Sequence, residues 1–339
     1  MRIQRVYWPF IILLLISSCK DSPLDIDVSG VEIEFTAKRF DKALFSSDYS
    51  DWQSLNQDLY QTYGEFWPNY QEVVLQLGPA GDSATLAECH RFVSDPTVQE
   101  IQTAIEKVHD PLIKEYNSAL QDAFKHYRYY FDNPVPEIYY YNSGFNFGIF
   151  PMDSCMGIGL DFFLGSDHEI IQKVPLEVFP QYRKRKMDPQ YLVTDAMRGW
   201  LVVSNQQKMD FKDLQSQIID FGKVLYTLDA CMPNTPDSLK MNYTSAQQDW
   251  VERNEERVWQ EIAKDDVLFQ TQSFEVSKWV SDGPFTSAPG IPQDSPPQLG
   301  IWIGWQVVRD YMAENPEVTI NQLWEEKNYS KILRFYRPG

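Results

Sequence analysis

The sequence has few of the side chains from which metal sites are usually built. Its 339 residues include only four histidines and four cysteines. His109 and His126 fall on the polar side of a predicted helix, where we expect them to be solvated. The segment His168–Gln172 is one residue short of the zinc-protease pattern H-E-x-x-H, because it ends in Gln, a poor zinc ligand. We therefore expect no bound metal and no cofactor.

Missing motifs and a shortage of basic residues exclude further classes of function. The sequence contains no G-x-S-x-G nucleophile turn and no phosphate-binding P-loop. Lys and Arg number 30 against 48 Asp and Glu, so the formal net charge is −18. Such a charge repels a phosphate backbone, which argues against nucleic acid as a partner. Because no catalytic set of residues is marked, we predict that the protein is not an enzyme.

A hydrophobic run long enough to span a membrane is missing at the N-terminus. The run Trp8–Ile16 has about nine residues and contains a proline. It follows a basic start and ends in I-S-S-C at Cys19, which is the pattern of a bacterial lipobox. We predict a lipoprotein signal peptide over residues 1–18, lipidation of Cys19 and a short polar tether over 19–30. The alternative is an ordinary secretory cleavage beside a chance cysteine.

The remaining cysteines do not form a recognisable framework. Cys89, Cys155 and Cys231 are odd in number and irregularly spaced. One pair could form in an oxidising periplasm, or all three could be buried free thiols.

Hydrophobic periodicity predicts a mostly helical chain. Residues 95–131 carry apolar side chains at every third or fourth position, with Asp95 as the N-cap. Pro111 should kink or split this helix. Other helices are expected at about 39–59, 189–206, 210–230, 245–264 (opened by a capping box at Ser245–Gln248) and 300–313, with a further one after Pro316.

The period changes between residues 135 and 165, where short apolar segments are joined by Gly and Asn turns typical of a small sheet. A half-exposed strand is also expected at Val31–Phe35, and residues 283–299 read as an irregular loop. We predict one globular α+β domain over residues 31–339, mainly α-helical, with a small central β-sheet.

We expect the predicted domain to be organised around the glycine-rich stretch over residues 156–191. Asp161 lies inside an apolar run, and the basic cluster 183–186 follows about twenty residues later. A buried acid is costly unless it is paired, so we expect Asp161 to pair with Arg183 or Arg185. The stretch is interpreted either as a ligand or partner site or as a β-rich centre with one structural ion pair.

Several motifs together resemble one known family. They are the lipobox at Cys19, R-F-D-K-A-L-F at 39–45, G-I-G-L-D-F-F-L-G at 157–165, Y-R-K-R-K-M-x-P-x-Y-L at 182–192, F-G-K-V-L-Y-x-L-D at 221–229 and G-I-W-I-G-W-Q-V-V-R-x-Y-M at 300–312. In this order they resemble GldB, the gliding-motility-associated lipoprotein family of Bacteroidetes. The resemblance implies a cell-envelope lipoprotein associated with gliding motility and the linked type IX secretion machinery.

GldB-like chains also look distantly related to predicted zinc peptidases that carry H-E-x-x-H on one helix and a Glu on the next. In register, that motif would fall near Asp195–Gly199 and the later Glu near Phe221. Neither His is present and the Glu is replaced. The resemblance therefore implies a degenerate zincin-like scaffold that has lost its metal.

A cleft without its metal can still bind a partner. We hypothesise a groove lined by polar residues of the family-like segments and filled by an acidic or extended peptide segment. Its candidate residues are Asp161, Tyr182, Arg183, Arg185, Tyr191 and Arg198. The alternative is an internal salt-bridge network.

These inferences describe a non-enzymatic lipoprotein of the cell envelope, membrane-anchored through its N-terminal lipid and facing the periplasm or the cell surface, with envelope proteins as partners. Two alternatives remain. One is a zinc-peptidase-like enzyme, and the other is a surface glycan- or nutrient-binding lipoprotein, suggested by an aromatic content of 14% and the anchor.

Overall fold

The computed structural model describes Leu24 and residues 26–46, 52–264 and 266–338, so the predicted signal peptide and Cys19 lie outside the described residues. It confirms a mainly helical α+β fold with a small sheet. In chain order the elements are β1 Ala37–Arg39, α1 Phe40–Phe45, α2 Trp52–Tyr63, α3 Phe66–Asn69, α4 Ser83–Ser94, α5 Pro96–His109, α6 Ile113–Tyr130, β2 Glu137–Tyr141, β3 Ile149–Pro151, β4 Cys155–Gly159, α7 Glu169–Lys173, α8 Gln181–Lys184, α9 Leu192–Asn205, α10 Leu214–Cys231, α11 Asp237–Lys240, α12 Ser245–Ile262, α13 Ser273–Val280, α14 Leu299–Glu314, α15 Ile320–Glu325 and α16 Tyr329–Leu333.

The four strands form one mixed sheet in the order β1-β2-β4-β3. β1, β2 and β4 are parallel, whereas β3 runs antiparallel to β4 and has no other strand beside it in the described chain. The strands expected between 135 and 165 are confirmed. The one expected at Val31–Phe35 is wrong, because that segment is irregular and the pairing with β2 begins only at Ala37.

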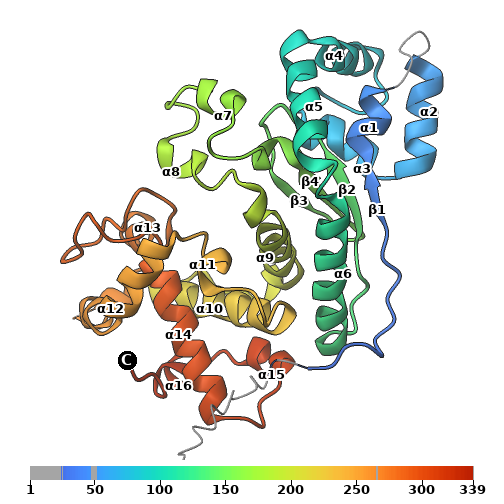
Figure 1. Ribbon diagram of the computed structural model, residues 1–339. Coiled ribbons are helices and arrows are strands. Elements are labelled where there is room, and N and C mark those ends of the chain that lie inside the picture. The colour runs from blue at the N-terminus through green and yellow to red at the C-terminus, as the bar shows by residue number, and fades with distance from the viewer. Residues whose placement is uncertain (1–23, 25, 47–51, 265, 339) are drawn as a thin grey trace, which may run out of the picture.

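Side chains of β2 alternate between two hydrophobic cores, as the two-residue period of a strand requires. Tyr139 and Tyr141 face a core built from α1 to α4. Ile138 and Tyr140 face a larger core that includes α5, α6, α9, α10 and α14. The sheet is therefore covered on both faces, with the N-terminal helices on one side and the long helices on the other (Figure 1).

The long helical stretch is split as predicted. The Asp95 carboxylate accepts hydrogen bonds from the backbone N–H groups of Thr97 and Val98, and α5 ends at His109, just before Pro111. The expectation that His109 and His126 are solvated is wrong, since both are buried. His109 Nε2 lies 3.0 Å from the Leu160 carbonyl oxygen, and burial lowers the pKa of His109 to about 4.

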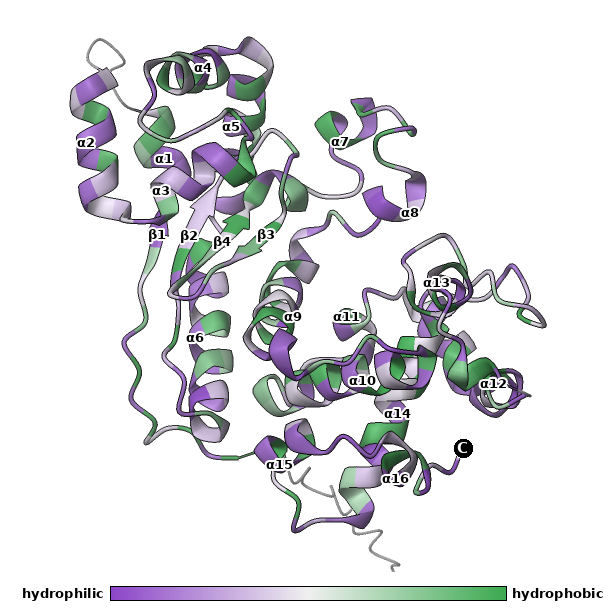
Figure 2. Cartoon of the chain, turned by 180° about the vertical axis from the view of Figure 1, so that it is seen from behind, coloured by the Kyte–Doolittle hydropathy of each residue, from purple (hydrophilic) through white to green (hydrophobic). Residues whose placement is uncertain are grey.

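Helices α10 and α14 cross with their backbones in close contact. A Cβ atom added to Gly304 would run into the Ile218 carbonyl group, and one added to Gly222 would run into the Gly304 carbonyl group. Both helices lie in the larger core, and α14 is among the most hydrophobic elements in Figure 2, whereas α2 and α12 are largely hydrophilic. The glycines of two family-like motifs thus have a packing role.

Two smaller predictions need correction or completion. The capping box of α12 is made by Thr244 and Gln247, one residue before the predicted one. The cysteines Cys89, Cys155 and Cys231 are buried free thiols.

The described chain starts against the C-terminal helices. Leu24 packs on the larger core and lines two surface hollows with Tyr226 and Met312. Within the residues covered by the structure, no helix is both long and apolar enough to cross a membrane.

Candidate functional site

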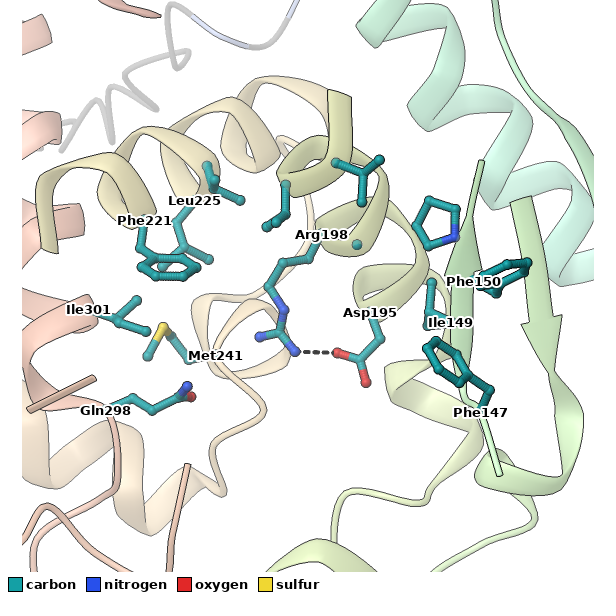
Figure 3. A pocket seen from close by; sticks show the side chains of 15 residues that line it. Phe147, Ile149, Phe150, Asp195, Arg198, Phe221, Leu225, Met241, Gln298 and Ile301 are labelled. Atoms are coloured by element: carbon teal, nitrogen blue, oxygen red, sulfur yellow. Dashed lines mark hydrogen bonds and ion pairs between the residues drawn. The ribbon is translucent and has the colours of Figure 1, made fainter. Parts of the chain in front are cut away.

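A hollow of about 660 Å³ opens beside the edge strand of the sheet. Figure 3 shows Phe147, Ile149 and Phe150 on one side and Phe221, Leu225, Met241, Gln298 and Ile301 on the other, with Asp195 and Arg198 of α9 between them. The hollow thus lies where β3 and α9 face α10 and α14, and its walls are mostly apolar.

A second hollow of about 400 Å³ continues from the first. The two share the lining residues Ile149, Asp195, Arg198 and Gln298, so we treat them as one cleft. The walls of the second hollow are both aromatic and charged. They include Phe162, Phe163, Phe179, Arg183, Lys186, Met187, Asn242 and Asp282.

An ion pair on α9 marks the junction of the two hollows. Arg198 Nη2 donates to Asp195 Oδ1 at 2.6 Å, and Arg198 Nη1 donates to the Lys240 carbonyl oxygen at 3.1 Å. Asn242 Nδ2 donates to the same Asp195 oxygen at 2.9 Å. The positions 195 and 198 are three apart on one helix, which brings their side chains to the same face. These bonds fix the guanidinium in the wall of the cleft.

The basic cluster 183–186 spreads in several directions. Lys184 is buried and donates to the carbonyl oxygens of residues 172 and 174. Arg185 Nη2 donates to the Asn242 carbonyl oxygen at 2.8 Å, with the Tyr191 hydroxyl 3.5 Å from Nη1. Only Arg183 and Lys186 line the cleft.

Lys186 and Arg183 differ in how they are held. Lys186 Nζ lies 2.5 Å from Asp282 Oδ1, and burial lowers the pKa of Lys186 against the opposing effect of Asp282. The side chain of Arg183 is exposed and, within the described chain, makes no hydrogen bond or ion pair. The far end of the cleft therefore carries two cations beside one paired carboxylate.

The expected pairing of Asp161 with Arg183 or Arg185 does not form. Asp161 is fully buried and accepts hydrogen bonds from Ser143 Oγ at 2.8 Å and from the backbone N–H of Phe145 at 2.6 Å. Burial raises the pKa of Asp161 to about 6, although these hydrogen bonds oppose the shift. Asp161 thus holds the turn that carries one wall of the cleft instead of lining it.

Backbone strain gathers around the cleft. Phe145, Asn242 and Gln298 have φ values of 66°, 54° and 60°, and they are three of the four non-glycine residues with positive φ in the described ranges. Asn242 and Gln298 line the cleft, and the ring of Phe145 packs edge-on against Phe162 and Phe179. Such conformations cost free energy and cluster at binding and active sites.

The structure brings together only part of the predicted groove. Arg183 and Arg198 line the cleft, whereas Arg185 and Tyr191 hold the loop behind it. Asp161 and Tyr182 are not among the lining residues. Sequence reasoning missed Ile149, Asp195 as an ion-pair partner, and Gln298. The i,i+3 spacing of Asp195 and Arg198 was the one available signal for this pair.

The positions that the resemblance assigns to a zinc motif do meet at the cleft. Asp195, Gly199 and Phe221 all line the first hollow. Their donor set does not fit zinc, because it offers one carboxylate that Arg198 and Asn242 already hold. Searched over the described residues, no group of three or more His, Cys, Asp or Glu side chains converges on one point.

A comparison with protein-family models gives a match that covers nearly the whole chain. The family model described as "Gliding motility protein GldB", a lipoprotein family, matches residues 21–338. No curated protein and no solved structure matches significantly.

Proposed function

Because the chain belongs to the GldB family of gliding motility proteins, we propose that it is a lipid-anchored, non-enzymatic component of the gliding apparatus and the linked type IX secretion machinery. The observation that carries this proposal is the family match from residue 21 to residue 338. The lipobox at Cys19 supports the anchor, since the Cys thiol is the group that such a signal prepares for acylation.

We further propose that the protein works by holding a segment of an envelope partner in the cleft. Three features support this mode of action. The first hollow has an apolar lining, Arg198 is fixed in the wall where the two hollows meet, and two residues with positive φ, Asn242 and Gln298, line the cleft. Apolar walls with a few fixed polar groups are typical of binding sites.

The alternatives predict a different cleft. A peptidase would need a set of metal ligands or a nucleophile with its base, and the two carboxylates that line the cleft, Asp195 and Asp282, are each paired with a cation and supply neither. A glycan site would be favoured by exposed Trp beside the groove, whereas the aromatic residues that line the cleft are Phe. Stoichiometric zinc in the purified protein, or a hit on a glycan array, would move either alternative to the front.

The test is a clean deletion, scored for colony spreading and for the secreted proteome. Complementation uses the wild-type chain, Cys19→Ala and Arg183→Glu. We expect wild type to restore both readouts and the two variants to fail, because one loses the acylated thiol and the other reverses the unpaired charge in the cleft. Normal spreading and secretion in the deletion strain would overturn the proposed role.

Arg253→Glu is the matched control for Arg183→Glu. It makes the same change of charge on an exposed side chain of α12 that does not line the cleft. Both variants must be present at wild-type levels. Full function of Arg183→Glu would exclude the cleft as the working surface.

A further inference from the structure

We propose that the open edge of β3 binds an extended, acidic peptide segment of a partner by strand addition. This inference rests on the proposed function, since it specifies what the cleft holds. It commits to one occupant, an internal segment with an acidic side chain flanked by apolar ones. The reasons are the hydrogen-bonding groups of β3, the lining beside them and the charge at the end of the cleft.

The register of β3 shows which backbone groups remain available. Met152 N–H donates to the Cys155 carbonyl oxygen, and Gly159 N–H donates to the Gly148 carbonyl oxygen. In an antiparallel pair the bonding direction alternates, so residues 148, 150 and 152 point toward β4. Ile149 and Pro151 then point their backbone groups away from the sheet.

The outer edge of β3 offers only a few backbone groups for hydrogen bonding to an added strand. Ile149 offers one N–H and one C=O, and Pro151 offers a C=O only. Neither residue has a backbone partner on that side within the described chain. An added antiparallel strand would make both bonds to Ile149 and one to the Pro151 carbonyl. The proline limits the edge to a short segment and discourages indefinite sheet growth.

The space beside β3 suits alternating side chains. Ile149, Phe150 and Pro151 are half-buried and line the first hollow, which also contains Leu225 and Ile301 from the opposite side. Gly199 on α9 lies against Ile149, and a Cβ there would come within 2.9 Å of the Ile149 Cγ2 atom. The absent side chain therefore lets Ile149 pack closely against α9. The open space for an apolar side chain of the occupant is the first hollow itself, between β3 and the wall that carries Leu225 and Ile301.

The charged side chains that line the cleft favour an acidic residue in the occupant. Arg198 lines both hollows with Ile149, and Arg183 and Lys186 follow in the second. Counting Asp195 and Asp282, these five groups sum to one positive charge in a chain whose net charge is −18. A carboxylate would meet this local positive potential, whereas a Lys side chain would be repelled.

The experiment uses the full lipidated chain in detergent and a labelled peptide, acetyl-Leu-Val-Asp-Val-Leu-amide, with binding read by fluorescence anisotropy. A second set of peptides carries one N-methyl group at each position in turn. Alternate N–H groups of a strand point to opposite edges, so affinity should fall about tenfold at alternate positions only. A peptide with Lys in place of Asp should also bind about tenfold more weakly.

Two protein variants test the same edge. Ile149→Pro removes the outward N–H, and Ile149→Ala keeps it while also losing the side chain. The Ile149 N–H would donate to a carbonyl oxygen of the peptide, so we expect the proline variant to bind the parent peptide about tenfold more weakly than the alanine variant does. Both variants keep the carbonyl oxygens that accept from the peptide, so both should keep the alternation. If wild type fails to bind the parent peptide at about 1 mM, or if every N-methyl position has the same effect, strand addition is overturned.

The outcome is separable from that of the proposed function. If N-methylation weakens binding at alternate positions but the deletion strain spreads and secretes normally, strand addition at β3 stands and the motility role is overturned. If the deletion strain loses spreading and secretion but N-methylation shows no alternation, the motility role stands and strand addition is overturned.

Discussion

Neighbouring residues of α10 have opposite surroundings. Gly222 lies against the backbone of α14, so closely that a single Cβ would collide with Gly304. Phe221 lines an open hollow of about 660 Å³. The same two helices thus form a closed contact on one side and one wall of a cleft on the other. A fixed crossing of α10 and α14 keeps this wall in place while its opposite wall belongs to the sheet.

The closed side is reinforced by a buried polar network. Asp229 on α10 accepts hydrogen bonds from Trp305 Nε1 at 2.9 Å and from Arg309 Nε at 2.8 Å, both on α14. Lys240, which is almost fully buried, donates to the other carboxylate oxygen at 2.7 Å. On the cleft side, the partly exposed Arg198–Asp195 pair has the corresponding role. We therefore expect stability to depend on the first region and binding on the second.

The largest effect is expected from Asp229→Ala. It leaves Lys240 as a buried charge without its carboxylate and removes three hydrogen bonds between α10 and α14, which should cost about 4 kcal/mol of unfolding free energy. Urea unfolding followed by circular dichroism measures it. Asp249→Ala is the control, because its ion pair with Arg253 is exposed, and it should change stability little. Equal losses in the two variants would contradict the comparison.

Next in size is Gly304→Ala, set against Gly199→Ala. The first places a methyl group on backbone atoms that cannot move alone, and we expect a loss of about 3 kcal/mol. The second comes within 2.9 Å of the Ile149 Cγ2 methyl, which is a side-chain atom on an edge strand, and it gains helix propensity. Thermal unfolding should therefore show a smaller loss, of about 1 kcal/mol or less. If Gly199→Ala is as damaging as Gly304→Ala, the cleft side is packed as tightly as the crossing.

A pH-dependent effect is expected from Asp161→Asn. The raised pKa of Asp161 means that the folded protein binds this proton more tightly than the unfolded chain does. The stability it contributes is therefore fully present below about pH 4 and lost as the pH rises through about 6. Relative to wild type, the variant should gain on the order of 2 kcal/mol between pH 4 and pH 7. Urea midpoints at several pH values measure the difference, and a difference independent of pH would contradict it.

The smallest effect on stability is expected from Arg198→Met. The side chain is about a third exposed, and Asn242 still donates to Asp195 after the change, so the loss should be about 1 kcal/mol or less. The variant should nevertheless lose the preference for the acid-centred peptide. A large loss of stability would move Arg198 to the structural side of the comparison.

Local patterns in the sequence predict much of the fold. Asp95 and Pro111 set the start and the break of the long helical stretch, because capping and a missing N–H act within one turn. The switch from helical spacing to short glycine-separated segments located β2 to β4. The sequence shows Gly222 and Gly304 within family-like motifs. It could not show that they meet, because they lie on helices that are far apart in sequence.

The cleft was less predictable, because its contacts are between distant segments. Asp161 was expected to need a cation, and instead backbone N–H groups and the Ser143 hydroxyl satisfy it. Arg185 donates to the carbonyl oxygen of Asn242, and any residue type at that position could supply that acceptor. His109 was misplaced for a related reason, since its acceptor is the Leu160 carbonyl group. Bonds to backbone atoms leave no signature in side-chain identity.

The position of Leu24 has a consequence for orientation. If Cys19 carries the lipid, four residues lie between it and Leu24, and the five Cα–Cα steps span at most about 18 Å. Leu24 packs beside Tyr226 and Met312, near α15, and Figure 1 places α2 and α4 at the opposite end of the molecule. The lipid anchor would then be a short tether. It would hold the end of the molecule with α15 near the bilayer, so that the end with α2 and α4 points away from the membrane.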